Sequence, residues 1–139
     1  VSRTNHQESW SQRVPSVSDL NDLKSLLKYC DICINVLSTI TLDAFIFDKP
    51  VINPVFGNEA NGMFDDQKFL NYAHLANLVD SKSSDIVKTT EEFLAALNNV
   101  LKSKEDKSIL RAKFLELQIS ESLEGTSKRI AQSLAQLNG

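Results

Sequence analysis

The sequence predicts an α/β fold, in which a parallel sheet is flanked by helices. Two short apolar runs rich in β-branched residues, 32–36 and 51–55, are typical of buried parallel strands. Segment 40–47 between them is too short and too apolar for an exposed helix. Lys49 and Pro50 end that helix, because proline disfavours helical geometry in the residue before it. Strand, helix and strand in this order predict a βαβ unit.

The rest of the chain continues the alternation of strands and helices. A third short strand is expected at 76–80, parallel to the other two. Ser18 and Asp19 are expected to cap the first helix. Helices are expected at 18–29, 65–73, 90–102, 105–119 and 126–137. We therefore interpret residues 1–139 as a single α/β domain, with 104–139 as a C-terminal helical segment.

Composition restricts the class of protein. A chain of 139 residues is large enough for one domain with a real core. Its net charge of −3 argues against a nucleic-acid surface, which needs a basic patch. No apolar run approaches the length of a membrane span. The sequence shows only three clear strands and no initiating Met, so we expect a piece of a longer protein.

Cys30 and Cys33 have the Cys-x-x-Cys spacing of redox and zinc sites. There is no second cysteine pair, and Cys33 falls inside the apolar run 32–36. Buried cysteine commonly packs as a small hydrophobic residue. We predict reduced thiols without a metal and a buried Cys33, which is consistent with a reducing cytoplasm.

The candidate site is the turn between the first strand and the helix after it. The carboxyl end of a parallel strand is where open α/β folds bind ligands, and the start of a helix favours phosphate. Ser38 and Thr39 occupy the N-cap region and would add two hydroxyls. Asp43 is the only charge between Ser38 and Phe47. It is either a ligand for hydroxyl groups, such as a ribose diol, or a carboxylate stabilised near a helix start.

The order of motifs resembles the carboxyl-terminal half of GT-B glycosyltransferases. In chain order these motifs are Cys30-Asp31, the first strand, Ser38-Thr39, Asp43-Ala44 and Lys49-Pro50-Val51-Ile52. The element Asp65-Asp66-Gln67 followed by Asn71 looks like one in the peptidoglycan-precursor GlcNAc transferase and its relatives. Segment 124–130 looks like the start of the terminal helix in bacterial surface-polysaccharide transferases. The resemblance covers about residues 17–137 and implies a Rossmann-like half of a two-domain enzyme.

The resemblance implies roles for the candidate residues. The intact enzyme would move a sugar from a nucleoside diphosphate to a glycan or lipid-linked acceptor. Ser38 and Thr39 would hold the diphosphate, and Asp43 would bind ribose. Asp66 and Gln67 would contact the sugar, although both residues are equally compatible with helix capping and simple exposure. No metal or other cofactor is implied.

The resemblance also implies where the rest of the enzyme lies. The general base would belong to the missing N-terminal half, so this chain alone would be inactive. The expected location is cytoplasmic, and a peripheral position at the inner membrane face is left open.

One departure from the family pattern and several alternatives accompany this interpretation. Retaining members carry two Glu residues where this chain has Asn35 and Asp43, which disfavours a retaining mechanism and weakens the ribose assignment. The enzyme alternatives are a UDP-N-acetylglucosamine 2-epimerase-like protein and a glycerophosphate or polyol-phosphate transferase. The non-enzyme alternative is an α/β interaction domain, because one fold serves many functions.

Overall fold

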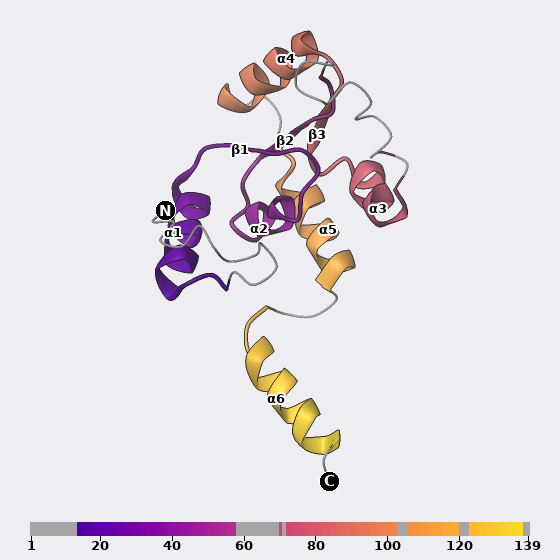
Figure 1. The fold of residues 1–139 in the computed structure, drawn as a ribbon. Coiled ribbons are helices and arrows are strands. Elements are labelled where there is room, and N and C mark those ends of the chain that lie inside the picture. The colour runs from indigo at the N-terminus through magenta and orange to yellow at the C-terminus, as the bar shows by residue number, and fades with distance from the viewer. Residues whose placement is uncertain (1–13, 58–69, 71, 103–105, 120–122, 138–139) are drawn as a thin grey trace.

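The computed structural model describes residues 14–57, 70, 72–102, 106–119 and 123–137. The described residues form a small three-stranded parallel sheet flanked by helices, which confirms the α/β class (Figure 1). The elements in chain order are α1 (Val17–Tyr29), β1 (Cys33–Ile34), α2 (Ile40–Ile46), β2 (Val51–Pro54), α3 (Ala73–Ser81), β3 (Asp85–Val87), α4 (Thr90–Leu101), α5 (Ser108–Ile119) and α6 (Thr126–Leu137).

The sheet has the strand order β1-β2-β3. Cys33 is in register with Val51, and Ile52 is in register with Asp85. Helices α2, α3 and α5 lie on one face of the sheet and α4 lies on the other (Figure 1). The βαβ unit predicted from the first two strands is therefore present, and its two strands are parallel neighbours.

The two predicted strands of this unit differ in burial. The central strand β2 is covered on both faces, and Val51 and Ile52 are 1% and 0% exposed. The edge strand β1 is reduced to Cys33–Ile34 and is not the buried strand expected at 32–36. Ile34 and Val36 are 49% and 38% exposed, because β1 has a neighbour on one side only among the described strands. β-branched residues alone did not distinguish an edge strand from a central one.

The prediction of a third strand at 76–80 is wrong. These residues belong to helix α3, where Leu75 and Leu78 lie three positions apart and both pack against the core. The third strand is β3, which lies outside every strand predicted from the sequence. Asp85 begins this strand, and its carboxylate accepts a hydrogen bond from Lys107 Nζ at 2.7 Å. That ion pair explains how a charged residue is accommodated there.

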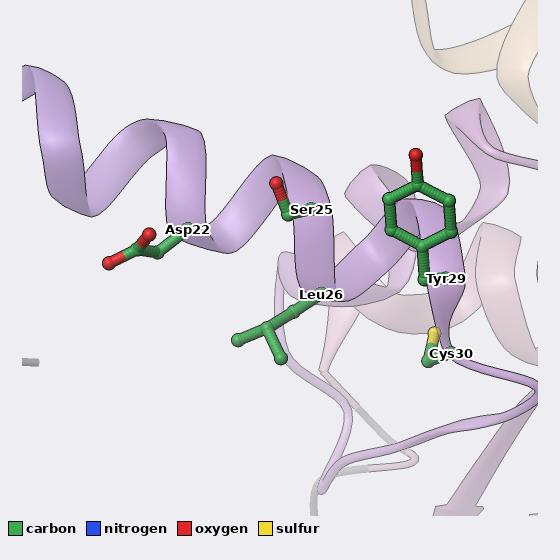
Figure 2. A pocket seen from close by; sticks show the side chains of 5 residues that line it. All are labelled: Asp22, Ser25, Leu26, Tyr29 and Cys30. Carbon is green, nitrogen blue, oxygen red and sulfur yellow. The ribbon is translucent and has the colours of Figure 1, made fainter.

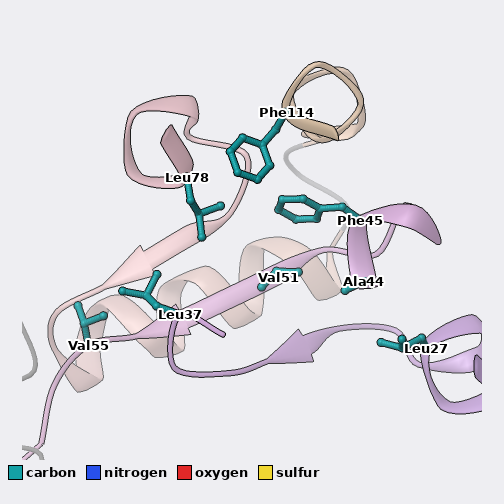
Figure 3. Packing of buried hydrophobic residues seen from close by; sticks show 8 residues of the cluster. All are labelled: Leu27, Leu37, Ala44, Phe45, Val51, Val55, Leu78 and Phe114. Carbon is teal, nitrogen blue, oxygen red and sulfur yellow. The ribbon is translucent and has the colours of Figure 1, made fainter. Parts of the chain in front are cut away.

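The hydrophobic core lies between the sheet and the helices of one face (Figure 3). Phe45 of α2 and Phe114 of α5 meet edge to face, with ring centroids 5.9 Å apart. The buried members of this cluster are Leu27, Leu37, Ala44, Phe45, Val51, Val55, Leu78 and Phe114. Six of these eight residues lie in α5 or in or next to the βαβ unit. Most of the described core is therefore formed by the βαβ unit together with α5.

An ion pair joins the end of α2 to α5. Asp48 follows α2 with a left-handed φ of 53°, and its Oδ1 accepts hydrogen bonds from Arg111 Nε and Nη2, both at 2.7 Å. The Arg111 side chain is 7% exposed and also lies 3.6 Å from Asp106 Oδ1. This contact fixes the exit of α2 and the direction in which the chain enters β2.

The two terminal helices are the least buried elements. Helix α1 is capped by Ser16, and not at Ser18 and Asp19 as predicted. Asp19 instead completes a capping box, in which its carboxylate accepts hydrogen bonds from the N–H and hydroxyl of Ser16. Helix α6 has the predicted bounds, buries no residue and extends away from the sheet (Figure 1). None of the described helices is long and apolar enough to cross a membrane.

Candidate functional site

The structure places the predicted site at the turn between β1 and α2. Ser38 and Thr39 follow the carboxyl end of β1 and are exposed, as expected from the βαβ order. Leu37 precedes them with φ 42°, in the left-handed region that a branched side chain rarely adopts. Its own side chain is 9% exposed and packs in the core. The turn is thus anchored by a buried residue on one side and open to solvent on the other.

The capping of α2 differs from the prediction. Thr39 is the N-cap residue, but its backbone is helical and its hydroxyl makes no capping hydrogen bond. The backbone N–H of Ser38 donates instead to Oδ1 of Asn35 at 2.9 Å. The Thr41 hydroxyl donates to the same oxygen at 3.0 Å. The Asn35 side chain therefore holds Ser38, the residue before the N-cap, and α2 has no side-chain cap among the described residues.

Asn53 of β2 completes a buried network under this turn. Its Nδ2 donates to the backbone oxygen of Asn35 at 2.9 Å and lies 3.2 Å from Asn35 Oδ1 and 3.4 Å from Thr41 Oγ1. Asn53 is 0% exposed, and its Oδ1 is buried with no hydrogen-bond partner. Asn53 was not among the site residues predicted from the sequence. The available signal was a polar residue between apolar neighbours in the run 51–55.

Hydrogen-bond donors without a partner among the described residues lie at the surface of the turn. The backbone N–H groups of Thr39 and Ile40 make no hydrogen bond to a described residue. The hydroxyls of Ser38 and Thr39 are likewise without a partner in the described part of the chain. Two N–H groups and two hydroxyls thus lie within residues 38–40, at the carboxyl edge of a parallel sheet. Such a group of neutral donors is suited to an anion.

Asp43 lies in the first turn of α2, as predicted, and is partly exposed. Its backbone N–H donates to Thr39 O at 3.4 Å, which places the two residues one helical turn apart. No described residue donates a hydrogen bond to its carboxylate. The carboxylate is therefore free to accept hydrogen bonds from hydroxyl groups of a ligand.

Cys30 and Cys33 are not joined by a disulfide. Cys33 is partly buried, and not fully buried as predicted, because β1 is an edge strand of the described sheet. Burial raises the pKa of the Cys33 thiol, a hydrogen bond from Asn35 opposes the rise, and Cys30 and Asp43 add to it. A raised pKa lowers the thiolate fraction needed for redox chemistry or metal binding. The described residues contain no cluster of three or more His, Cys, Asp or Glu that could hold a metal ion.

Two of the predicted site residues cannot be placed in the fold. Asp66 and Gln67 lie outside the described residues, as do Asp65 and Asn71 and most of the helix expected at 65–73. Their predicted contacts with a sugar remain predictions.

A concave region lies beside α1. It is an open pocket of about 620 Å³ lined by Asp22, Ser25, Leu26, Tyr29 and Cys30. Figure 2 shows that the side chains of Leu26 and Tyr29 point in different directions and do not converge on one point. The lining contains one carboxylate and no basic group, so it does not suit an anion.

Comparison of the chain with protein-family models, with curated proteins and with solved structures gives no match.

Proposed function

We propose that this chain is the sugar-nucleotide-binding domain of a glycosyltransferase and that the turn 38–40 holds the diphosphate. The observation that carries the proposal is the set of two N–H groups and two hydroxyls without a described partner at this turn. Donors already fixed by folding bind an anion without a further cost of ordering. Their position at the carboxyl edge of a parallel sheet supports the same assignment.

Asp43 gives the site a second, different chemistry. A carboxylate beside phosphate would repel it, so Asp43 is suited to a neutral part of the ligand. The hydroxyls of a ribose supply two donors for one carboxylate, and the Asp43 side chain, to which no described residue donates, supplies the acceptors. In the proposal the diphosphate therefore lies over residues 38–40 and the nucleoside lies toward Asp43.

The chemical role of the turn would be to stabilise the leaving group. When the sugar departs from a nucleoside diphosphate, negative charge grows on the diphosphate. Fixed donors directed at that charge lower the barrier, because they do not have to reorient during the reaction. The intact enzyme would transfer the sugar to a glycan or lipid-linked acceptor, and its general base would lie outside this chain. Asp66 and Gln67 keep their proposed contacts with the sugar.

One observation favours a non-enzymatic alternative. Helix α6 exposes Ile130, Leu134 and Leu137 at helical spacing, with exposed fractions of 55%, 57% and 81%. An apolar stripe of this kind is also typical of a helix that docks on a protein partner. An interaction domain would use this stripe and would not need the donors at 38–40. Nucleotide binding therefore separates the two functions.

The test is a titration of the ¹⁵N-labelled chain with UDP, CDP and GDP. We expect at least one nucleotide to bind, with an affinity on the order of 1 mM, or roughly −4 kcal/mol, since in the proposal residues outside this chain complete the donor site. Asp43→Ala removes a charged acceptor, which typically costs about 1.5–3 kcal/mol, so its binding should become undetectable. Asp22→Ala is the matched control, because Asp22 is an exposed helical carboxylate on α1.

Two outcomes would reject the proposal. The first is the absence of any amide shift in residues 38–43 with all three nucleotides. The second is an Asp43→Ala variant that binds as tightly as the wild type and the Asp22→Ala control. Either result would favour the interaction domain.

A further inference from the structure

Two local rules of protein structure are broken at the candidate site. Leu37 holds a left-handed φ of 42°, which costs free energy for any residue with a branched side chain. Asn53 is completely buried between Val51 and Val55, although its Oδ1 has no hydrogen-bond partner. A valine or leucine would avoid that penalty at position 53. Leu37 and Asn53 lie 16 positions apart in the chain, and both are hydrogen-bonded to Asn35.

Asn35 connects three elements through one oxygen atom. Its Oδ1 accepts from Ser38 N at 2.9 Å, from Thr41 Oγ1 at 3.0 Å and from Asn53 Nδ2 at 3.2 Å. These donors come from the turn, from α2 and from β2. The backbone oxygen of Asn35 accepts two more bonds, from Leu37 N at 3.2 Å and from Asn53 Nδ2 at 2.9 Å. Asn35 thus holds both the N–H of the strained Leu37 and the N–H of Ser38, the residue after it.

We propose that Asn35 and Asn53 are positioning residues, which fix the left-handed turn at Leu37 and so keep the donors of residues 38–40 at the surface. Without Asn35 Oδ1, the N–H of Ser38 loses its acceptor and Leu37 can return to negative φ. That rotation would redirect the chain and bury or scatter the unused donors. The amide nitrogen of Asn53 holds Asn35 in place. The energetic cost of this role is that Asn53 Oδ1 stays buried without a hydrogen-bond partner. The effect on a ligand rests on the proposed function; the effect on the turn does not.

The turn itself is tested by hydrogen exchange at the Ser38 amide. Asn35→Ala should accelerate that exchange roughly tenfold, because it removes the only acceptor of this N–H among the residues that the structure describes. Asn35→Asp should restore a rate near that of the wild type, since a carboxylate keeps the acceptor oxygen. Asn53→Val should accelerate exchange as well, by loosening Asn35. Ser84→Ala is the matched control, because it removes another buried side-chain oxygen without a partner, at the start of β3.

The effect on ligand binding is tested with UDP at the concentration that half-saturates the wild type. Asn53→Val should lose the amide shifts at Thr39 and Ile40, although Asn53 is 0% exposed and cannot touch the nucleotide. Ser84→Ala should keep them. If Asn53 had a purely structural role, Asn53→Val and a core variant such as Val55→Ala would lower the thermal stability equally. Asn53→Val would then show no selective loss of these amide shifts.

The outcomes separate this inference from the proposed function. Unchanged Ser38 exchange in folded Asn35→Ala, or in folded Asn53→Val if the first variant does not fold, would overturn the positioning role. Failure of Asn35→Asp to restore the wild-type rate would also overturn it. If the exchange rates follow the expectation but the wild type binds none of UDP, CDP and GDP, the positioning role stands and the proposed function fails.

Discussion

The βαβ unit and helix α6 are stabilised in different ways. Helix α2 has only seven residues, yet it buries Thr41, Ala44 and Phe45 against the sheet and α5. Helix α6 has twelve residues and buries none. A helix as short as α2 is unstable alone, so its structure depends on packing, whereas no residue of α6 is buried against the rest of the described chain. Burial therefore identifies the part of this chain that can hold strained or unpaired groups. Helix length does not identify it.

The largest expected effect is at the centre of the βαβ unit. Phe45 is 2% exposed and meets Phe114 edge to face. Phe45→Ala should lower the free energy of unfolding by about 3–5 kcal/mol, because it removes buried area and leaves a cavity. Urea denaturation followed by circular dichroism measures this loss. A loss below about 1 kcal/mol would show that the core is not organised around α2.

The ion pair between α2 and α5 should have a smaller effect. Asp48→Asn keeps a residue that tolerates left-handed φ, but it removes the charge opposite the buried Arg111 guanidinium. Since the Asp48 side chain is 64% exposed, we expect a loss of about 1–2 kcal/mol in the free energy of unfolding. The control is Asp80→Asn, an exposed carboxylate on α3. Equal stability of the two variants would contradict a stabilising role of the pair.

The capping box of α1 should contribute less to the free energy of unfolding than the ion pair does. Ser16→Ala removes the N-cap acceptor of the Asp19 N–H, which typically costs about 1 kcal/mol. Hydrogen bonds from the hydroxyl and then the N–H of Ser16 lower the pKa of Asp19 below its ordinary value of 3.8. A lowered folded pKa stabilises the helix above pH 3.8, and this contribution disappears as pH falls through the folded pKa.

The pH dependence can be checked without denaturant. The helical signal of α1 should decrease below pH 3.8 in the wild type, and the decrease should be weaker in Ser16→Ala, where the hydroxyl bond to Asp19 is already absent. Identical acid transitions in the two proteins would show that the capping box does not set the pKa of Asp19.

The smallest effect is expected on α6. Leu134 is 57% exposed, so Leu134→Ala should change the free energy of unfolding by less than about 0.5 kcal/mol. Measured beside Phe45→Ala, it completes the comparison between the two regions. A loss above about 1 kcal/mol would mean that α6 packs against another surface in solution.

The sequence predicted the βαβ unit because its signals are local. The apolar runs 32–36 and 51–55 and the proline that ends the helix all act within a few residues. The third strand was misplaced because a short apolar run has the same composition in a buried strand and in a short helix. Only the packing of Leu75 and Leu78 on the core distinguishes the two.

The candidate site was predicted in position but not in its internal contacts. The order strand, turn and helix is enough to place Ser38, Thr39 and Asp43 at one edge of the sheet. The role of Asn35 and Asn53 depends on a contact across 18 residues, which periodicity cannot reveal. A buried polar residue inside an apolar strand was the one local sign of that contact.

The central claim is that the turn 38–40 binds phosphate groups, and the most direct measurement compares UDP with uridine on the ¹⁵N-labelled chain. We expect UDP to shift the amides of Thr39 and Ile40 and uridine at the same concentration not to shift them, and we expect neither ligand to shift the amides of 126–137. Equal shifts with UDP and uridine, or shifts confined to residues outside 38–43, would contradict this claim.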